Sequence, residues 1–596
     1  MKLLYAFLAL LFAAQLSAQT TPHLPRYLTE EEKLMLPHLK APSQLPQSGF
    51  TDPPSAPVRT MAEWEELQAL LITWNGNSQW LSILTEIVRA AREECRVVIN
   101  CGSQSTVTNA QSMLTAANVD ISSNVEFVVV PNNSIWIRDY GPNCVYANDV
   151  DSLLFVDWIY NRPTRPRDDT MSTTLAPYFN VPLYRTLLAP NDLVNTGGNF
   201  MSDGMGTAFS SELILDENKF GNKYGVSPKT EPQIDDIIQD FMGIRRYIKM
   251  DTLPYDAIHH IDMHMKLLDE ETIMVGQYPT GVADGPQIEA NIQYVLNNFT
   301  SSFGTPYKVV RIPMPPHNNL YPNNGGNYRT YANAVFVNKT VIVPFYEEKF
   351  DTTARRIWEG ALPGYNIVGI NSNAIIPSLG AIHCITKEVG VADPLRIVHQ
   401  ELPSCMDNAD WPLGYPVWAT LQHKSGIASA KIYYANTPDG PWQSADLPYY
   451  PLDDTTWTHK GYIPLQPDGS TVYYYIEGTA NNGKTLARPL PAPKGHWHFC
   501  TTETVSTTES PKAQLLDIYP NPASAITVIP VSTTAKTSGN IWVFNALGQM
   551  VEHVFGGEFP AGPSNYFIDA ARFMPGTYFV QLQTGNQNIL KKLVVK

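Results

Sequence analysis

Short apolar runs of strand length alternate with amphipathic segments through the first two-thirds of the chain. The run 69–74 predicts a buried strand, and the segment 80–92, whose apolar residues recur at helical spacing, predicts a helix. A strand at 97–100, a helix at 107–117 and a strand at 125–130 are expected next. Strands that alternate with helices in this way are typical of an α/β domain.

The same alternation continues to about residue 402. We expect further strands at 153–158, 208–215, 272–276, 308–313, 334–337, 341–344 and 366–370, and further helices at 233–241, 286–299 and 352–358. Polar motifs stand where several of the apolar strands end. Loops at strand ends are where a rigid scaffold presents catalytic groups, so we expect the active residues there.

Beyond Cys405 the helical periodicity disappears. Runs rich in Thr, Tyr and Val, separated by turn sequences, predict strands at 417–423, 429–434, 457–463 and 470–476. Their length and spacing favour an immunoglobulin-like β-sandwich over 403–500. A Ser/Thr-rich linker at 501–514 is then expected to lead to a second all-β module at 515–596.

The N-terminal residues differ from both regions. Lys2, the apolar block 3–14 and the small residues before Gln19 predict a secretory signal peptide, residues 1–18, with cleavage after Ala18. Residues 19–58 are rich in Pro, Gln, Ser and charged residues, and we expect a prosegment or a loosely packed arm. The α/β catalytic domain is therefore expected to span 59–402.

Length and charge narrow the possible functions. The 596 residues exceed what one ordinary core can organise, so several domains are expected. The formal charge of -15 argues against binding to nucleic acid or to anionic membranes. It would suit a cationic substrate, although solubility alone would also account for it. No internal apolar run reaches the roughly 20 residues of a transmembrane helix.

Export would place the cysteines in an oxidising environment. We expect a disulfide between Cys405 and Cys500, which bracket the predicted sandwich, and another between Cys95 and Cys101, which are close in sequence. These pairings would leave Cys384 free.

Cys384 stands in a Gly-led apolar turn, residues 380–386. A cysteine is a good nucleophile as its thiolate, which a nearby cation, a helix N-terminus or a histidine can stabilise. Taken alone, such a turn more commonly holds a buried and inert cysteine. Three other polar stretches, 136–139, 260–262 and 331–333, favour the catalytic interpretation.

Two carboxylates in these stretches suggest a specific chemistry. Asp139 and Asp262, at predicted strand ends, could hold a planar guanidinium through fork-like hydrogen bonds and leave its central carbon exposed. The Cys384 thiolate could attack that carbon, ammonia would leave, and water would hydrolyse the thiouronium. His260, on the same face of a predicted strand as Asp262, could protonate the leaving amine and deprotonate the water. Asn333 could orient either partner.

Each residue also has a simpler interpretation. Asp139 could be a turn-former before Gly141-Pro142, and Asn333 a strand-end cap. The alternation of His260, Asp262 and His264 could instead form a metal site, although Cys384 would then be unexplained. We expect His264 to pack at the rim of the site, and Arg138 to form a structural salt bridge.

Five motifs in the same order resemble the agmatine deiminase and Porphyromonas-type peptidylarginine deiminase family. They are 136–142, 260–262, 313–316, 331–333 and 380–386, and the resemblance covers about 59–402. It implies a pentein fold, an α/β-propeller of five strand–helix modules around a central site. It also implies guanidine-modifying chemistry without a cofactor and without a metal.

Carried over by motif, the resemblance makes Cys384 the nucleophile, His260 the acid and base, and Asp139 and Asp262 the guanidinium clamps. Asn333 would be a supporting polar group.

Four further residues are candidates for contact with the substrate. Trp136 would pack beside the aliphatic stem of the substrate. In the peptidyl branch of the family, arginines after the first Asp motif hold a terminal carboxylate, and Arg162 and Arg165 are the candidates, although a basic surface loop would also explain them. Ile258 stands where an aromatic residue is expected at the substrate wall.

The last module resembles the C-terminal sorting domain of type IX secretion, through 519–522 and 591–595. This resemblance implies the type IX secretion machinery as a partner and a secreted or cell-surface location.

The leading prediction is a deiminase that converts peptidyl-arginine, chiefly at chain ends, to peptidyl-citrulline and ammonia. The alternative is agmatine deiminase, which yields N-carbamoylputrescine. More distant alternatives are a metal-dependent guanidine hydrolase that releases urea and a non-enzymatic surface binding protein. The expected partner is an arginine-containing peptide or protein, or a small guanidine such as agmatine; no nucleic acid is expected.

Overall fold

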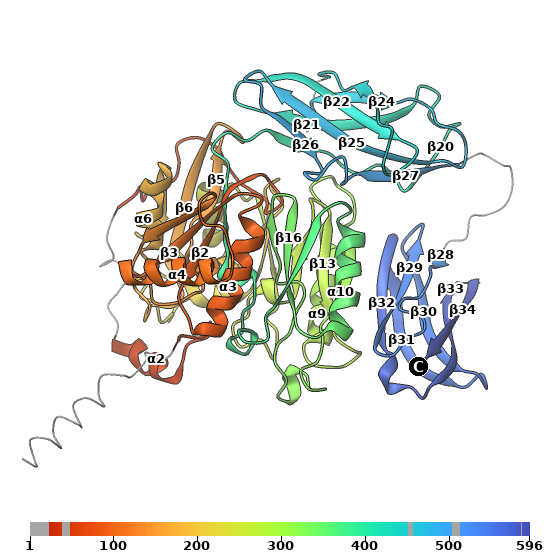
Figure 1. Ribbon diagram of the computed structural model, residues 1–596, viewed down its shortest axis with the longest axis horizontal. Coiled ribbons are helices and arrows are strands. Elements are labelled where there is room, and N and C mark those ends of the chain that lie inside the picture. Colours follow the sequence, from red (N-terminus) through yellow and green to blue (C-terminus); the bar gives the residue numbers. More distant parts are fainter. Residues whose placement is uncertain (1–22, 39–47, 451–456, 503–512, 586) are drawn as a thin grey trace, which may run out of the picture.

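The computed structural model describes residues 23–38, 48–450, 457–502, 513–585 and 587–596. Three bodies are visible in Figure 1: an α/β body, a β-sandwich above it, and a second all-β module beside it. The predicted signal peptide and most of the predicted linker lie outside the described residues.

Between residues 58 and 390, all of which the structure describes, the strands form five small sheets. One has the order β18-β2-β3-β4, in which β2, β3 and β4 are parallel and β18 is antiparallel to β2. Its elements are β2 (Leu67–Trp74), α3 (Ser78–Ala91), β3 (Arg96–Cys101), α4 (Gln104–Ala116), β4 (Val125–Val129) and β18 (Lys387–Gly390). The last strand of the α/β body thus pairs with one of its first, which joins the two ends of this region.

The other four sheets have the orders β1-β5-β6-β7 with β8 beside β6, β11-β10-β9, β12-β13-β14 and β15-β16-β17. Their strands are β1 (Val58–Thr60), β5 (Asn143–Ala147), β6 (Ser152–Tyr160), β7 (Leu183–Thr186), β8 (Val194–Asn195), β9 (Met201–Ser202), β10 (Thr207–Ser211), β11 (Arg246–Met250), β12 (Met265–Leu267), β13 (Thr272–Gln277), β14 (Lys308–Pro313), β15 (Val335–Val337), β16 (Thr340–Phe345) and β17 (Asn366–Asn371). The accompanying helices are α5 (Ile137–Tyr140), α6 (Met171–Phe179), α7 (Leu213–Asn218), α8 (Glu231–Met242), α9 (Gly285–Asn298) and α10 (Glu348–Ala361).

Helix α3 illustrates why these segments fold as predicted. The Asn77 side chain accepts hydrogen bonds from the backbone N–H groups of Gln79 and Trp80, which caps the N-terminus of the helix. Its apolar face, including Leu84 and Ile87, is fully buried against the sheet. Burial of each such side chain contributes roughly 1.5–3 kcal/mol, so the face that gave the helical pattern also fixes the helix in place.

Most predicted strands and helices are confirmed within a few residues, but the strand predicted at 208–215 is wrong in its second half. Strand β10 ends at Ser211 and α7 begins at Leu213. The Ser211 hydroxyl accepts a hydrogen bond from the N–H of Leu213, and Asn218 donates from its side chain to the Ile214 carbonyl. These local bonds favour a turn and a short helix where the apolar run alone suggested a continuing strand.

The region predicted to be an immunoglobulin-like sandwich is all-β over its described residues, in two sheets with the orders β19-β21-β24 and β20-β27-β25-β22-β23, with β26 beside β25. Its strands are β19 (Arg396–Val398), β20 (Cys405–Asp407), β21 (Tyr415–Gln422), β22 (Ile427–Ala435), β23 (Gln443–Asp446), β24 (His459–Ile463), β25 (Thr471–Ala480), β26 (Thr485–Arg488) and β27 (Trp497–Thr502). The predicted disulfide between Cys405 and Cys500 is confirmed and joins β20 to β27.

The second predicted disulfide is wrong, because Cys95 and Cys101 are both free and buried. Cys95 directly precedes β3, and Cys101 is the last residue of that strand. An extended strand advances about 3.3 Å per residue, so roughly 20 Å separates the two residues. A disulfide requires Cα atoms within about 7 Å.

The C-terminal module has two further sheets in its described residues, β28-β29-β32 and β31-β30-β33-β34. Its strands are β28 (Ala513–Leu515), β29 (Ile526–Thr533), β30 (Thr537–Asn545), β31 (Met550–Phe559), β32 (Gly562–Asp569), β33 (Gly576–Thr584) and β34 (Gln587–Val595). Ile526 and Val528 extend the core of the α/β body, and β32 lies against β14. In Figure 1 the module accordingly stands beside β13 and α10.

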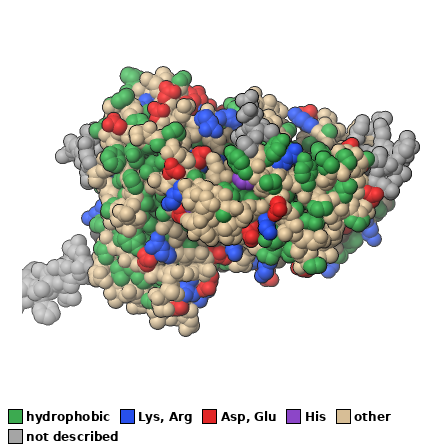
Figure 2. All heavy atoms as spheres, turned by 90° about the horizontal axis from the view of Figure 1, so that it is seen from above, with side chains coloured by type: hydrophobic (Ala, Val, Ile, Leu, Met, Phe, Trp, Pro, Cys, Tyr) green, Lys and Arg blue, Asp and Glu red, His purple; other side chains and the backbone are tan. Residues whose placement is uncertain are grey.

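The surface carries both signs of charge. Figure 2 shows acidic and basic side chains interspersed over the face seen from above, without a patch of one sign. No helix in the described part of the chain is long and apolar enough to cross a membrane.

Candidate active site

Cys384 lies at the base of the site, in the short 3-10 turn His383–Ile385, and is fully buried. Gly380, four residues earlier, passes directly beneath Trp136: a Cβ added at this glycine would overlap the Trp136 ring. The Gly-led turn therefore allows the close approach that brings Cys384 and Trp136 to the same place.

The predicted carboxylates come from two other short turns. Asp139 lies in α5, and Asp262 lies in a 3-10 turn, Ile261–Met263. The prediction that His260 and Asp262 share one face of a strand is wrong, because His260 precedes this turn and strand β12 begins only at Met265. His259 has a positive φ of 56°, so the backbone turns here and the two-residue alternation does not apply.

A guanidinium does lie between these carboxylates, and it belongs to the chain itself. Arg26 Nε and Nη2 donate to Asp139 Oδ2 and Oδ1 at 2.9 and 2.8 Å. Its Nη1 and Nη2 donate to Asp262 Oδ1 and Oδ2, both at 3.1 Å. Nη1 is also 2.7 Å from Cys384 Sγ, and the Arg26 side chain is fully buried. The two aspartates and the sulfur therefore surround one guanidinium.

The Arg26 backbone is held as well. Its N–H donates to the Ser378 carbonyl at 3.0 Å, and its carbonyl accepts from Arg162 Nε at 2.9 Å. The Trp136 indole N–H donates to the Leu24 carbonyl at 2.9 Å. The site thus contacts peptide groups on both sides of an arginine.

Arg26 was not among the predicted site residues, and it lies in the stretch that was expected to be a prosegment or a loosely packed arm. This segment contains α2 (Glu30–Met35) and the 3-10 turn Leu36–His38. Its apolar pattern is short, and a lone arginine after a proline carries no signal of burial. The capping box formed by Thr29 and Glu32 is the one local sign of order that the sequence offers.

The interpretation of Arg162 and Arg165 as a basic surface loop is wrong, because both side chains are buried. Arg165 donates to both carboxylate oxygens of Glu32, at 2.8 and 2.9 Å, and to the Tyr27 carbonyl at 2.9 Å. Both arginines therefore contact the N-terminal segment. Ile258, the remaining predicted substrate-wall residue, is buried in the loop before His260.

Asn333 contacts the Cys384 sulfur. Its Nδ2 lies 3.2 Å from Cys384 Sγ and donates to the Asp262 carbonyl at 3.0 Å, while its Oδ1 accepts from the His383 N–H at 3.1 Å. These contacts connect the two turns that carry Cys384 and Asp262.

His260 is fully buried beside Asp139, with Nδ1 3.5 Å from Asp139 Oδ1. Neither of its ring nitrogens has a hydrogen-bond partner in the part of the chain that the structure describes. A buried histidine without partners is costly, and such groups are found at functional sites.

Three further residues, His383, Glu63 and Lys266, extend the site and were not predicted to belong to it. The His383 ring bridges Asp262 Oδ2, 2.9 Å from Nδ1, and Glu63 Oε1, 2.9 Å from Nε2. Lys266 pairs with the other Glu63 oxygen. The position of His383 beside Cys384 in the motif was the available signal. The predicted structural salt bridge of Arg138 is confirmed, with Glu388 at 2.6 Å.

Gly198 lies against the guanidinium, and its role was also missed. A Cβ at this position would overlap Arg26 Nη2 and approach His260 Nδ1 to 2.7 Å and Asp139 Oδ1 to 2.9 Å. The backbone therefore forms one wall of the site, which requires a residue without a side chain.

The charges in the site favour ionised clamps. Burial alone would raise the pKa of Asp139, but the charge of Arg26 and its hydrogen bonds lower it below its ordinary value. Burial acts in the same way on Asp262, and Arg26 together with His383 holds its pKa well below the ordinary range. Both carboxylates are therefore charged at neutral pH.

The pKa values of His260 and Cys384, the predicted acid–base and nucleophilic groups, shift in opposite directions. Burial and the charge of Arg26 lower the pKa of His260 to about 3, against the opposing effect of Asp139 and Asp262. Burial and the two carboxylates raise the pKa of Cys384 well above its ordinary value, although the Arg26 charge acts to lower it. With Arg26 in place, both groups are neutral.

The metal alternative gains no support from the side-chain geometry. No group of three His, Cys, Asp or Glu residues is placed to bind a metal ion within the described ranges. His264 is buried beside β12, and burial lowers its pKa to about 4.

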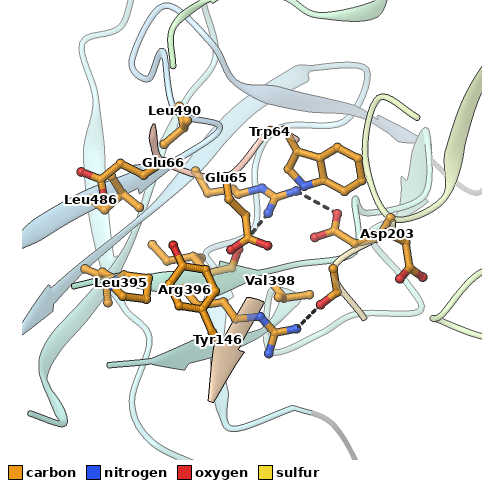
Figure 3. Close-up of a pocket in the computed structure, with 15 residues that line it drawn as sticks. Trp64, Glu65, Glu66, Tyr146, Asp203, Leu395, Arg396, Val398, Leu486 and Leu490 are labelled. Carbon is orange, nitrogen blue, oxygen red and sulfur yellow. Dashed lines mark hydrogen bonds and ion pairs between the residues drawn. The ribbon is translucent and has the colours of Figure 1, made fainter. Parts of the chain in front are cut away.

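A separate cavity lies between the α/β body and the β-sandwich (Figure 3). Charged residues that line it already have partners: Glu65 pairs with Arg59 at 2.5 Å, and Arg488 pairs with Glu270 at 2.8 Å. None of the predicted site residues lines this cavity.

Comparison with known proteins decides the family. The model for Porphyromonas-type peptidyl-arginine deiminase matches residues 59–389, more than half of the chain. The chain belongs to this family. Deiminases of this kind are hydrolases that act on carbon–nitrogen bonds of linear amidines, so the predicted reaction class is confirmed.

Several known proteins are similar to part of the chain. Proteins named "Putative agmatine deiminase" from Mycoplasma mycoides and Vibrio parahaemolyticus are 22% and 25% identical, covering 55% and 45% of this chain and 94% and 79% of their own. The agmatine deiminases of C. jejuni and Enterococcus faecalis align with TM-scores of 0.46 and 0.47, at 24% and 20% identity. They cover 56% and 57% of this deiminase and 95% and 96% of their own chains.

Residues 517–596 match the model for the secretion system C-terminal sorting domain. The predicted sorting domain is therefore confirmed, and it implies export and surface attachment.

Proposed function

We propose that this deiminase hydrolyses arginine side chains within peptides or proteins to citrulline and ammonia. The observation that carries the proposal is the way Arg26 is held. Three hydrogen bonds join the site to peptide groups around this residue: to its own N–H, to its carbonyl and to the carbonyl of Leu24. Agmatine has no peptide groups, so it would leave Arg162 and Trp136 without these partners.

In this mechanism Asp139 and Asp262 bind the substrate guanidinium as they bind that of Arg26. Four charge-assisted hydrogen bonds fix the plane of the group, and Nη1 lies 2.7 Å from the sulfur that would attack the adjacent central carbon. Positioning of this kind replaces a bimolecular encounter with a contact between prealigned atoms.

Cys384 passes its thiol proton to the neutral His260 and forms a bond from Sγ to the guanidinium carbon. The carbon–nitrogen bond breaks, and the nitrogen takes that proton from His260 and leaves as ammonia. Water adds to the thiouronium carbon, the carbon–sulfur bond breaks, and the urea group of citrulline remains. The sum is one guanidinium and one water converted to one ureido group and one ammonium ion.

His260 is the group that exchanges protons in this scheme. It is buried beside Asp139, and its ring nitrogens have no other hydrogen-bond partner in the described residues. It can protonate the leaving nitrogen and later take a proton from the attacking water. Asn333, 3.2 Å from the sulfur, holds the nucleophile in place, and Trp136 and Ile258 border the substrate.

We also infer that the five sheets of the α/β body are the five modules of a pentein α/β-propeller. The pairing of β18 with β2, which joins the last module to the first, supports a closed ring. The signal peptide, the immunoglobulin-like identity of the sandwich and recognition by the type IX secretion machinery belong to the same proposal.

A substrate panel tests the function. The panel contains a peptide with an internal arginine, a peptide that ends in arginine, and agmatine, with citrulline, N-carbamoylputrescine and urea as readouts. Because Arg26 fills the site, the panel is measured on the full chain and on its Arg26→Ala variant. We expect citrulline from the peptides, with the internal arginine preferred. A preference for agmatine, or the release of urea, would contradict the proposal.

A further inference from the structure

We propose that residues 23–38, here called the arm, are a built-in inhibitor that occupies the peptide-binding site of this deiminase and keeps it latent. The inference rests on the proposed function, because it treats the arm as an imitation of a peptide substrate. The structure supplies three observations for it: the position of Arg26, a second anchor at Glu32, and the covalent link between arm and enzyme.

The first anchor fills the catalytic centre completely. Arg26 satisfies both clamp carboxylates, and it lies 2.7 Å from Cys384 Sγ. Cys384 and Arg26 are both fully buried. A substrate arginine cannot enter while this side chain is present, because the same oxygens and the same space are in use.

The second anchor lies outside the catalytic centre. Glu32 accepts two hydrogen bonds from Arg165 and one from the Thr164 hydroxyl at 2.8 Å. Burial alone would raise the pKa of Glu32, but Arg165 and the Thr29 N–H lower it to about 2. This ion pair is therefore formed throughout the neutral range, and a free peptide with an arginine alone would lack it.

The arm also competes from within the same molecule. A ligand that is covalently joined to its own site binds in an intramolecular event, at an effective concentration that can reach the order of millimolar. A peptide substrate must exceed that concentration or bind more tightly before it displaces the arm. The two anchors and the covalent link thus favour the state in which the arm occupies the site when no substrate is present.

The arm does not resemble a simple packing element. Arg26 is the part of the arm that enters the site, while Glu30 and Lys33 on the outer side of α2 are exposed and pair with each other. A structural role alone would not require a guanidinium in contact with the reacting sulfur.

The test compares the full chain with its Arg26→Ala variant, and Lys33→Ala serves as the matched control on the same arm. Two readouts are taken at neutral pH: citrulline release from an arginine peptide well below millimolar concentration, and the rate at which iodoacetamide alkylates Cys384, measured by peptide mapping. We expect Arg26→Ala to raise both rates by about tenfold or more, given the millimolar effective concentration of the arm. Lys33→Ala should leave both rates unchanged.

The two readouts separate this inference from the proposed function. Faster alkylation in Arg26→Ala, without citrulline release from any variant, would support the blocking arm and contradict the peptide substrate. Equal alkylation and equal citrulline release in all three proteins would overturn the inference and leave the function intact. Conversion of Arg26 itself to citrulline in the resting protein would also overturn it, because the arm would then be a first substrate and not a lasting inhibitor.

Discussion

Arg26 Nη1 lies 2.7 Å from Cys384 Sγ, although 358 positions of the chain separate the two residues. The contact joins the N-terminal arm to a turn that closes the α/β body. It also places a guanidinium between two carboxylates that the sequence had assigned to guanidinium binding. The Arg26 side chain therefore occupies the position that we propose for the guanidinium of a substrate.

A side chain at Gly198 should fill the space beside the guanidinium and strongly weaken the binding of a substrate arginine. In Gly198→Ala the new Cβ would overlap the position of Nη2 of the bound arginine. We expect the rate of citrulline release at low substrate to fall by roughly 100-fold or more in the Arg26→Ala background, since misplacement by about 1 Å costs about that much. The melting temperature of the variant should change little.

Gly360→Ala is the matched control, because a Cβ there meets no atom within 4 Å and the residue lies in α10. It should retain full activity. Normal activity in Gly198→Ala would show that substrate binds elsewhere.

Neutralising Asp139, one of the two proposed clamp carboxylates, should strongly reduce the stabilisation of the transition state. Asp139 donates no hydrogen bonds and accepts two from the guanidinium, so Asp139→Asn removes a charge and turns one acceptor into a donor. Loss of one partner from a buried charge pair costs roughly 2–5 kcal/mol. We expect kcat/KM to fall by a factor on the order of 10² to 10³ in the Arg26→Ala background, since about 1.36 kcal/mol corresponds to tenfold.

Asp240→Asn, at an exposed position of α8, controls for the general loss of one negative charge. If Asp139→Asn were no worse than this control, the clamp assignment would be wrong.

The pH dependence should reveal the charge of the bound guanidinium. Arg26 lowers the pKa of His260 to about 3 and also acts to lower that of Cys384. A substrate guanidinium in the same place should lower both pKa values, since a nearby positive charge disfavours protonation of histidine and favours the thiolate.

The Arg26→Ala variant is used for this measurement, because its site is free to bind substrate. The profile of kcat/KM reports groups in the free enzyme, and that of kcat reports groups in the complex. Both apparent pKa values should therefore be lower in kcat than in kcat/KM. Coincident profiles, measured as initial rates from pH 5 to pH 10, would argue against titration of these groups beside the substrate.

The second anchor of the arm should contribute less than the first. Glu32→Gln keeps the shape of the side chain but removes the charge that pairs with Arg165. We expect Cys384 to be alkylated faster than in the full chain, and more slowly than in Arg26→Ala. Glu31→Gln, at an exposed neighbouring position, is the control and should behave like the unaltered chain. An effect of the same size in both variants would indicate a general effect of charge on α2.

The sequence predicted the elements well where one pattern decided them. Strand β2 was predicted from a short continuous apolar run. Helix α3 was predicted from apolar residues that recur at helical spacing. The end of β10 was missed because the hydrogen bonds of Ser211 and Asn218 override an apolar run, and periodicity does not report such bonds.

The candidate site shows a similar division. Asp139, Asp262, Asn333 and Cys384 were located from motifs, and the structure brings them together around one guanidinium. Their local conformations were not predictable, because 3-10 turns have no period of their own.

A different reason explains why the sequence did not predict Arg26, Gly198 and the contact between Glu63 and His383. Each depends on a contact between segments that are far apart in the chain, and a single sequence holds no record of such contacts.

The most direct test of the central claim is citrulline release from an arginine peptide by the Arg26→Ala variant, with and without Cys384→Ala. The free and buried Cys144 provides the control substitution, Cys144→Ala. If Cys384 attacks the guanidinium held by the two aspartates, Cys384→Ala will abolish release and Cys144→Ala will leave most of it. Undiminished release by the Cys384→Ala protein would contradict the account.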